Sequence, residues 1–178
     1  MTPMQKYLVV SLITSDRAGL AEYFSSLASD HNCNVEDSRM SLLGAEFVAS
    51  LLLKGDATNI DSAAAAYRAL NQEDFLVQLK ETTDEPAASD SLPYYIHAIT
   101  VDGLGIIQKV TDFLTQKSIN IESLQTESYK APHTGIQMLE IAVHIYVPAT
   151  TQINDLREQF ATLCDELNLD STFEAITH

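Results

Sequence analysis

The spacing of apolar residues changes along the chain, and these changes predict a regular series of strands and helices. Residues 7–14 (YLVVSLIT) are rich in β-branched and aliphatic side chains, which favours a strand. The next apolar residues recur at the spacing of one helix face, namely Leu20, Tyr23, Phe24, Leu27 and Ala28. The pattern then predicts strands at 35–42, 45–54 and 75–80, with a second helix at 59–70.

The second half of the chain repeats this order of elements. Its predicted strands are 94–100, 121–129, 136–147 and 172–176. One helix is predicted from the stripe Ile106, Val110, Phe113 and Leu114, and another over residues 153–167. The polar segment between the halves predicts two domains at 1–83 and 92–178, joined by a linker at 84–91.

Direct sequence identity between the halves indicates an internal duplication. Residues 13–20 (ITSDRAGL) return as 99–106 (ITVDGLGI), and 34–36 (NVE) return as 120–122 (NIE), always shifted by 86 positions. One or two identities would be expected by chance, since any residue type makes up roughly 5–10% of a protein. Six identities in two patches therefore predict two copies of one fold.

The order strand-helix-strand-strand-helix-strand is typical of a ferredoxin-like unit. We therefore predict an α+β protein of two tandem ferredoxin-like domains, each an antiparallel sheet with helices on one face. The strands are apolar at successive positions, as in Leu8, Val9 and Val10. A sheet with one solvated face should alternate apolar and polar residues, so a second face or an edge is expected to meet another sheet. A homo-oligomer is expected on this basis.

The composition restricts the possible partners and compartments. Ten Lys and Arg against 25 Asp and Glu give a net charge of −15, which opposes direct binding to nucleic acid. Cys33 and Cys164 have no metal-ligand spacing and are expected to be small buried residues. Because no signal peptide and no apolar stretch of membrane-spanning length are evident, a cytoplasmic protein without membrane association is expected.

Two segments in each repeat are candidates for binding a small molecule. The turns Asp16–Gly19 and Asp102–Gly105 precede the first predicted helix of each half, where exposed N–H groups attract carboxylates. Asn34 and Asn120 enter the following strand with amides that donate and accept hydrogen bonds. Together they would suit an amino-acid zwitterion. The alternative is structural, with Ser15 or Asp16 capping the helix and the glycines required by the turn.

These residues resemble those of ACT domains, which are regulatory modules that sense amino acids. The D-R-x-G turn and the run N-C-N-V-E-D-S-R at residues 32–39, followed by L-G-A-E-F at 43–47, resemble more specifically a family of tandem ACT-domain transcriptional repressors. The resemblance implies no enzymatic activity and no cofactor. It implies repression of glycine cleavage genes by contact with a LysR-type DNA-binding activator, with relief by glycine.

In ACT domains the ligand lies between paired domains, against the strand-to-helix turn of one and the start of the second strand of another. The resemblance implies ligand contacts by Asp16, Arg17, Ala18, Gly19, Leu20, Asn34 and Val35, with Asp102, Gly105, Ile106, Asn120 and Ile121 as counterparts. The second repeat departs from the motif, because Gly103 and Leu104 replace Arg17 and Ala18. Two equivalent sites are therefore not implied.

Two other functions remain open at this point. An enzyme is disfavoured because no nucleophile-base spacing, phosphate-binding loop or zinc-protease motif occurs, although carboxylate chemistry is compatible with the composition. Five histidines are present, and those in predicted strands, His97 and His144, are expected to be structural. The second alternative is a tandem ACT sensor of another amino acid that acts on a metabolic enzyme.

Overall fold

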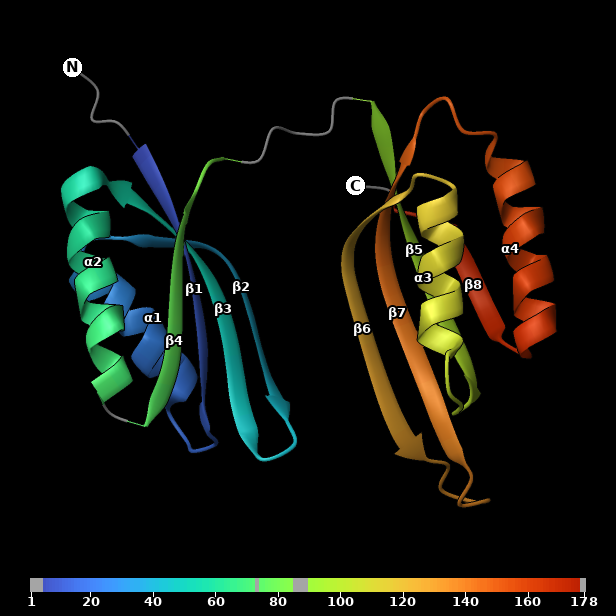
Figure 1. The fold of residues 1–178 in the computed structure, drawn as a ribbon, viewed down its shortest axis with the longest axis horizontal. Helices are drawn as coiled ribbons and strands as arrows, with labels where there is room; N and C mark the ends of the chain where they lie inside the picture. The colour runs from blue at the N-terminus through green and yellow to red at the C-terminus, as the bar shows by residue number, and fades with distance from the viewer. Residues whose placement is uncertain (1–4, 73, 85–89, 177–178) are drawn as a thin grey trace. The chain divides into compact units, whose positions relative to one another are not determined.

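The chain forms two compact units, Met1–Pro86 and Ala87–His178, and each has the order βαββαβ (Figure 1). The computed structural model describes residues 5–72, 74–84 and 90–176. Most of the predicted linker, residues 85–89, lies outside the described residues, and its last residue already belongs to a strand. The domain boundaries therefore stay a prediction. Of the helices in the described part of the chain, none has the length and apolar character needed to cross a membrane.

The first unit is a four-stranded antiparallel sheet in the order β2-β3-β1-β4. Its elements are β1 (Gln5–Ser15), α1 (Leu20–Asp30), β2 (Asn34–Leu43), β3 (Glu46–Asp56), α2 (Ala57–Ala69), a short 3-10 helix (Leu70–Gln72) and β4 (Phe75–Thr82). The hairpin predicted with its turn at Leu43 and Gly44 is present, but the two turn residues that join β2 to β3 are Gly44 and Ala45. The predicted elements are all present, and most extend one to three residues further than the pattern indicates.

The second unit has the same topology, with sheet order β6-β7-β5-β8. Its elements are β5 (Ser91–Val101), α3 (Ile106–Gln116), β6 (Asn120–Lys130), β7 (Gln137–Pro148), α4 (Ile153–Leu167) and β8 (Asp170–Ala175). Strand β5 begins three residues earlier than predicted and includes Pro93. This proline lacks an N–H donor, but its carbonyl accepts a 3.0 Å hydrogen bond from the Ile176 N–H. The predicted fold, two ferredoxin-like α+β units, is confirmed.

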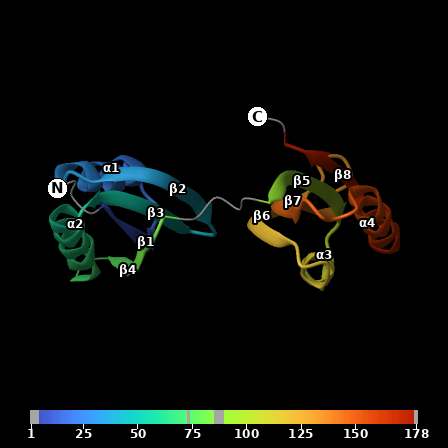
Figure 2. The same cartoon turned by 90° about the horizontal axis from the view of Figure 1, so that it is seen from above.

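Both helices of each unit cover the same face of the sheet (Figure 2). In the first unit, Val10 and Leu51 from the sheet pack with Phe24 of α1 and Tyr67 of α2, and all four are nearly inaccessible to solvent. The Tyr67 hydroxyl donates to the carbonyl oxygen of Phe24, which joins the two helices through the core. The opposite face of each sheet carries alternate residues such as Val9 and is not covered by the helices of its unit.

Candidate functional site

The predicted turn Asp16–Gly19 lies at the end of the first sheet where the β2–β3 hairpin also lies. The Asp16 N–H donates to the Ala45 carbonyl oxygen at 3.2 Å, which fixes the turn against this hairpin. The predicted cap by Ser15 or Asp16 is wrong, because α1 begins only at Leu20 and no side chain caps it. The cap position belongs to Gly19, and Asp16 lies four positions before the first helical residue.

Gly19 has a backbone conformation that other residues rarely adopt, with φ +91°. The Tyr23 N–H donates to the Gly19 carbonyl at 2.9 Å and closes the first helical turn. The N–H groups before Tyr23 have no intrahelical partner and no side-chain cap. They give the helix start a partial positive charge that favours an anion, although Glu22 in the same turn supplies some negative charge.

A hollow of about 300 Å³ opens beside this helix start. Its lining consists of Arg17, Ala18, Gly19, Leu20, Tyr23 and Phe75. The Arg17 guanidinium lies 5.1 Å from the centroid of the Phe75 ring, and the Tyr23 ring stacks on the same ring at 6.2 Å. The hollow thus joins a cation and free N–H groups to an aromatic wall, which suits a small carboxylate with an organic substituent.

Tyr23 and Phe75 are absent from the residues predicted for the site. Their apolar spacing in the sequence indicates core residues, and Phe75 is indeed buried, whereas Tyr23 is 39% exposed. Phe75 reaches the turn because β4 pairs with the end of β1, where Phe75 lies opposite Thr14. The strand order of a ferredoxin-like sheet predicts that β4 lies beside β1. It does not predict that Phe75 lies opposite Thr14, because that pairing depends on the register of the two strands.

The equivalent turn of the second unit has the same backbone conformation at its glycine but different neighbouring side chains. Gly105 has φ +82° at the start of α3, and it too lacks a side-chain cap. The Asp102 carboxylate accepts a 2.7 Å hydrogen bond from the Ser128 hydroxyl, which holds the turn against β6. Gly103 stands where the first unit has Arg17, and Leu104 is fully exposed to solvent. This turn therefore lacks the cation found in the first.

Asn34 lies at the start of β2 and contacts a second, polar hollow. Its amide donates to the Glu36 carboxylate at 2.8 Å. The hollow has a volume of about 410 Å³ and is lined by Gln5, Asn32, Asn34, Glu36, Lys54, Gly55, Asp56 and Asn59. A hydrogen bond with the Tyr7 hydroxyl and then the charge of Glu36 raise the pKa of Lys54, so this amine stays protonated. Val35, also predicted for the site, is half-buried and pairs with Leu53.

The two predicted segments lie at opposite ends of the sheet within one unit. Asn34 pairs with Lys54, which lies opposite Tyr7 of β1, whereas the turn follows Ser15 at the other end of that strand. Eight residues at about 3.3 Å each separate these ends by roughly 26 Å. One amino acid cannot contact both segments of a single unit. The second unit has the same arrangement, because Asn120 pairs with Tyr146 at the end of the sheet opposite Gly105.

No three His, Cys, Asp or Glu side chains among the described residues are arranged to hold a metal ion. Cys33 and Cys164 are buried as predicted, and burial raises the pKa of both thiols. His97 pairs with Glu140 at 2.6 Å on the uncovered face of the second sheet, consistent with a structural role.

The family model described as an ACT domain matches residues 6–74, which is most of the first unit. The glycine cleavage system transcriptional repressor of Escherichia coli (strain K12) is 26% identical over 175 residues, covering 98% of this chain and 92% of that protein. The protein of the same name from Shigella flexneri matches with the same values.

Two solved structures match nearly the whole chain. One is a protein of unknown function from Galdieria sulphuraria, with a TM-score of 0.79 and 25% identity over 98% of this chain and all of that one. The other is a candidate glycine cleavage system transcriptional repressor, with a TM-score of 0.71 and 24% identity over 98% of this chain and 99% of that one. These matches agree with the predicted tandem ACT architecture. The chain is similar throughout its length to repressors named for the glycine cleavage system, and its first unit matches the ACT domain.

Proposed function

We propose that this protein is an amino-acid-responsive transcriptional regulator that represses glycine cleavage genes by contacting a LysR-type activator, and that glycine relieves the repression. The observation that carries the proposal is the similarity to the glycine cleavage repressor of Escherichia coli, which extends over 98% of the chain. The charge of −15 supports action through a protein partner, because an acidic protein is repelled by phosphates.

The hollow at the start of α1 supports a small amino acid as the signal. A ligand carboxylate would lie against the uncapped N–H groups and the Arg17 guanidinium. Asp16 at the same turn carries a negative charge that would attract the ligand ammonium group. The second turn has no cation equivalent to Arg17, and this difference favours the first unit as the ligand-binding one.

Calorimetric titration with each of the twenty amino acids tests the ligand. We expect glycine to bind with a dissociation constant in the high-micromolar to millimolar range, or about −4 to −6 kcal/mol. The Arg17→Met variant should bind at least about tenfold more weakly, because a charge-assisted hydrogen bond contributes about 1.5–3 kcal/mol. Arg68→Met is the matched control, since Arg68 is an exposed cation of α2 that does not line the hollow. Equal losses in both variants would indicate a general effect of charge and would contradict the site.

Binding to the activator is measured separately, with and without glycine. We expect glycine to weaken the complex about 5- to 150-fold, and linkage requires the activator to weaken glycine binding by the same factor. Asn34→Ala in the same assay tests whether the start of β2 contributes to the response. A complex that is insensitive to glycine would remove glycine relief from the proposal.

Binding to DNA is expected to require the activator. Gel-shift titration of the purified protein in low salt should show no sequence-specific complex. Low salt strengthens charge interactions with phosphates, and the net charge of −15 makes the overall interaction repulsive. Tight, sequence-dependent binding by the protein alone would contradict regulation through a protein partner.

A further inference from the structure

The Arg17 guanidinium lies against an aromatic ring and not against a carboxylate. Its distance of 5.1 Å from the centroid of the Phe75 ring is within the roughly 6 Å over which an aromatic face attracts a cation. Among the described residues, no carboxylate is within ion-pairing distance of this guanidinium. Its positive charge is therefore available to an anion from outside the chain.

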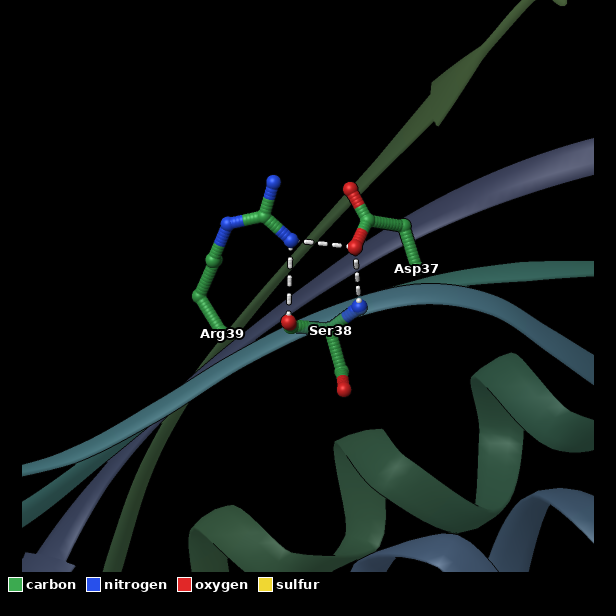
Figure 3. A network of polar contacts seen from close by, with 3 residues as sticks. All are labelled: Asp37, Ser38 and Arg39. Carbon is green, nitrogen blue, oxygen red and sulfur yellow. Dashed lines mark hydrogen bonds and ion pairs between the residues drawn. The ribbon is translucent and has the colours of Figure 1, made fainter. Parts of the chain in front are cut away.

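Arg39, another cation of the first unit, shows the opposite arrangement. Its guanidinium pairs with the Asp37 carboxylate and donates a 3.0 Å hydrogen bond to the Ser38 carbonyl (Figure 3). These partners are its immediate neighbours on β2, so the charge is compensated locally and needs no ligand. The contrast indicates that Arg17 is the cation of this pair that is available for binding.

The Phe75 ring is held in place by two neighbouring rings. It packs edge-on against Phe24, with the ring centroids 5.8 Å apart, and the Tyr23 ring stacks on it at 6.2 Å. Phe75 and Phe24 are buried, whereas Tyr23 is 39% exposed at the edge of the hollow. A ring held in this way gives Arg17 a fixed surface, so its side chain loses less freedom when it binds a ligand.

The second unit has a different residue at each of the corresponding positions. At the constant shift of 86 positions, Gly103 stands in place of Arg17. At the same shift, Lys109 stands in place of Tyr23. The second turn therefore has neither the cation nor the exposed ring that stacks beside it in the first unit.

The counterpart of Phe75 follows from a hydrogen bond that both units share. In the first unit the Thr14 hydroxyl donates, at 3.0 Å, to the carbonyl of the residue just before Phe75. In the second unit the equivalent Thr100 hydroxyl donates, at 3.0 Å, to the carbonyl of the residue just before Leu169. The cation and both rings thus differ together between the units, whereas the glycine with positive φ is present in both turns. This is expected if the three side chains act as one group.

We propose that Phe75 and Tyr23 are positioning residues that hold Arg17 for the carboxylate of the ligand and thereby make the site selective for a free carboxylate. The inference rests on the proposed function, because it concerns the same amino-acid site. Arg17 and the uncapped N–H groups at the start of α1 border the same hollow. A ligand carboxylate accepts charge-assisted hydrogen bonds from both, and an amide in its place cannot.

Glycine titrations of the full-length chain, followed by NMR, test the positioning. Glycine is a suitable probe because it has no side chain to contact the aromatic wall directly. Phe75→Leu removes the ring under the guanidinium and should weaken glycine binding about two- to fivefold. Tyr23→Leu should also weaken binding, whereas Tyr23→Phe keeps the ring and should bind as the original chain does. Because Tyr23 is partly exposed, its variants provide the test if Phe75→Leu does not fold.

Phe47→Leu is the matched control for the loss of a ring. The Phe47 ring also contacts Phe24, with the centroids 6.2 Å apart, but Phe47 does not line the hollow. Its removal should leave glycine affinity unchanged. Circular dichroism of each variant shows whether it is folded.

A double-mutant cycle with Arg17→Met separates positioning from a general effect on the fold. In the Arg17→Met background, Phe75→Leu and Tyr23→Leu should no longer change glycine affinity, because the group that they position is absent. Glycinamide measures the selectivity for a carboxylate. The original chain should bind it at least about tenfold more weakly than glycine, and this ratio should fall in Phe75→Leu.

The possible failures are distinguishable. Unchanged glycine affinity in a folded variant that lacks either ring would overturn the inference and leave glycine binding intact. Equal losses in Phe75→Leu and Phe47→Leu would do the same, as would an undiminished effect of Phe75→Leu in the Arg17→Met background. An original chain that does not bind glycine would overturn both the inference and the proposed role of glycine.

Discussion

The two glycines of the second turn, Gly103 and Gly105, should respond oppositely to alanine. Gly105 has φ +82°, where an L-residue costs about 1–2 kcal/mol, whereas the φ of Gly103 lies outside this region. A Cβ at Gly103 would lie 3.4 Å from Cδ1 of Ile106, which is an ordinary contact, and one at Gly105 would meet nothing within 4 Å. Backbone strain is therefore the main difference between the two substitutions.

Both substitutions restrict the unfolded chain equally, which stabilises the folded state by about 0.4–1 kcal/mol. Gly103→Ala should therefore be neutral or slightly stabilising, and Gly105→Ala should be less stable than Gly103→Ala by about 1–2 kcal/mol. For a unit of this size the melting temperatures should differ by about 4–8 °C per kcal/mol. Differential scanning calorimetry measures the transition of the second unit.

A third variant separates strain from side-chain size. Asparagine tolerates the left-handed region, and Asn168 already adopts φ 52° at the end of α4. Gly105→Asn should therefore recover part of the stability lost in Gly105→Ala. Equal melting temperatures for the Gly103→Ala and Gly105→Ala variants would refute the reasoning. A melting temperature of Gly105→Asn below that of Gly105→Ala would also refute it.

Three further outcomes follow from the core. Tyr67→Phe should lower the free energy of unfolding by about 0.5–1.5 kcal/mol in urea titrations, because it removes the hydrogen bond to the Phe24 carbonyl; unchanged stability would mean that this bond contributes nothing. Cys33 and Cys164 should react with a thiol reagent at pH 8 much more slowly in the folded chain than in urea, and equal rates would contradict their burial. Burial raises the pKa of both thiols above the ordinary 9.0, so the folded chain keeps these protons at a pH where the unfolded chain loses them. The contribution of the two thiols to the free energy of unfolding is therefore complete below pH 9.0 and declines as the pH rises through the folded-state pKa. Unfolding curves recorded at a series of alkaline pH values measure this decline.

The sequence predicts the fold well because each element has a strong local signal. The period of two in the strands, the helix stripe through Phe24 and the duplication at a constant shift all follow from side chains close together in sequence. The boundaries are less accurate. Strand β5 includes Ser91 and Pro93, because antiparallel pairing with β7 compensates for their unfavourable strand propensity.

The candidate site is harder to predict because its residues are brought together by pairing between distant strands. The D-R-x-G turn is visible in the sequence, but Phe75 reaches it only through the register of β4 against β1. The predicted cap by Asp16 is wrong for a related reason. Its N–H bonds to the Ala45 carbonyl of the hairpin, a contact between segments distant in sequence, and α1 begins only at Leu20.

The identities shared by the two repeats need not mark ligand contacts. Gly19 and Gly105 both have positive φ at the start of a helix, and this backbone requirement explains the shared glycine without any ligand. What distinguishes the two turns is the replacement of Arg17 by Gly103, together with the aromatic wall formed by Phe75. The differences between the repeats therefore carry more information about binding than the identities do. If the first turn alone binds the amino acid, removing the Arg17 charge should shift the response to ligand concentrations at least about tenfold higher. Substitutions at the second turn should then alter stability and leave ligand affinity unchanged.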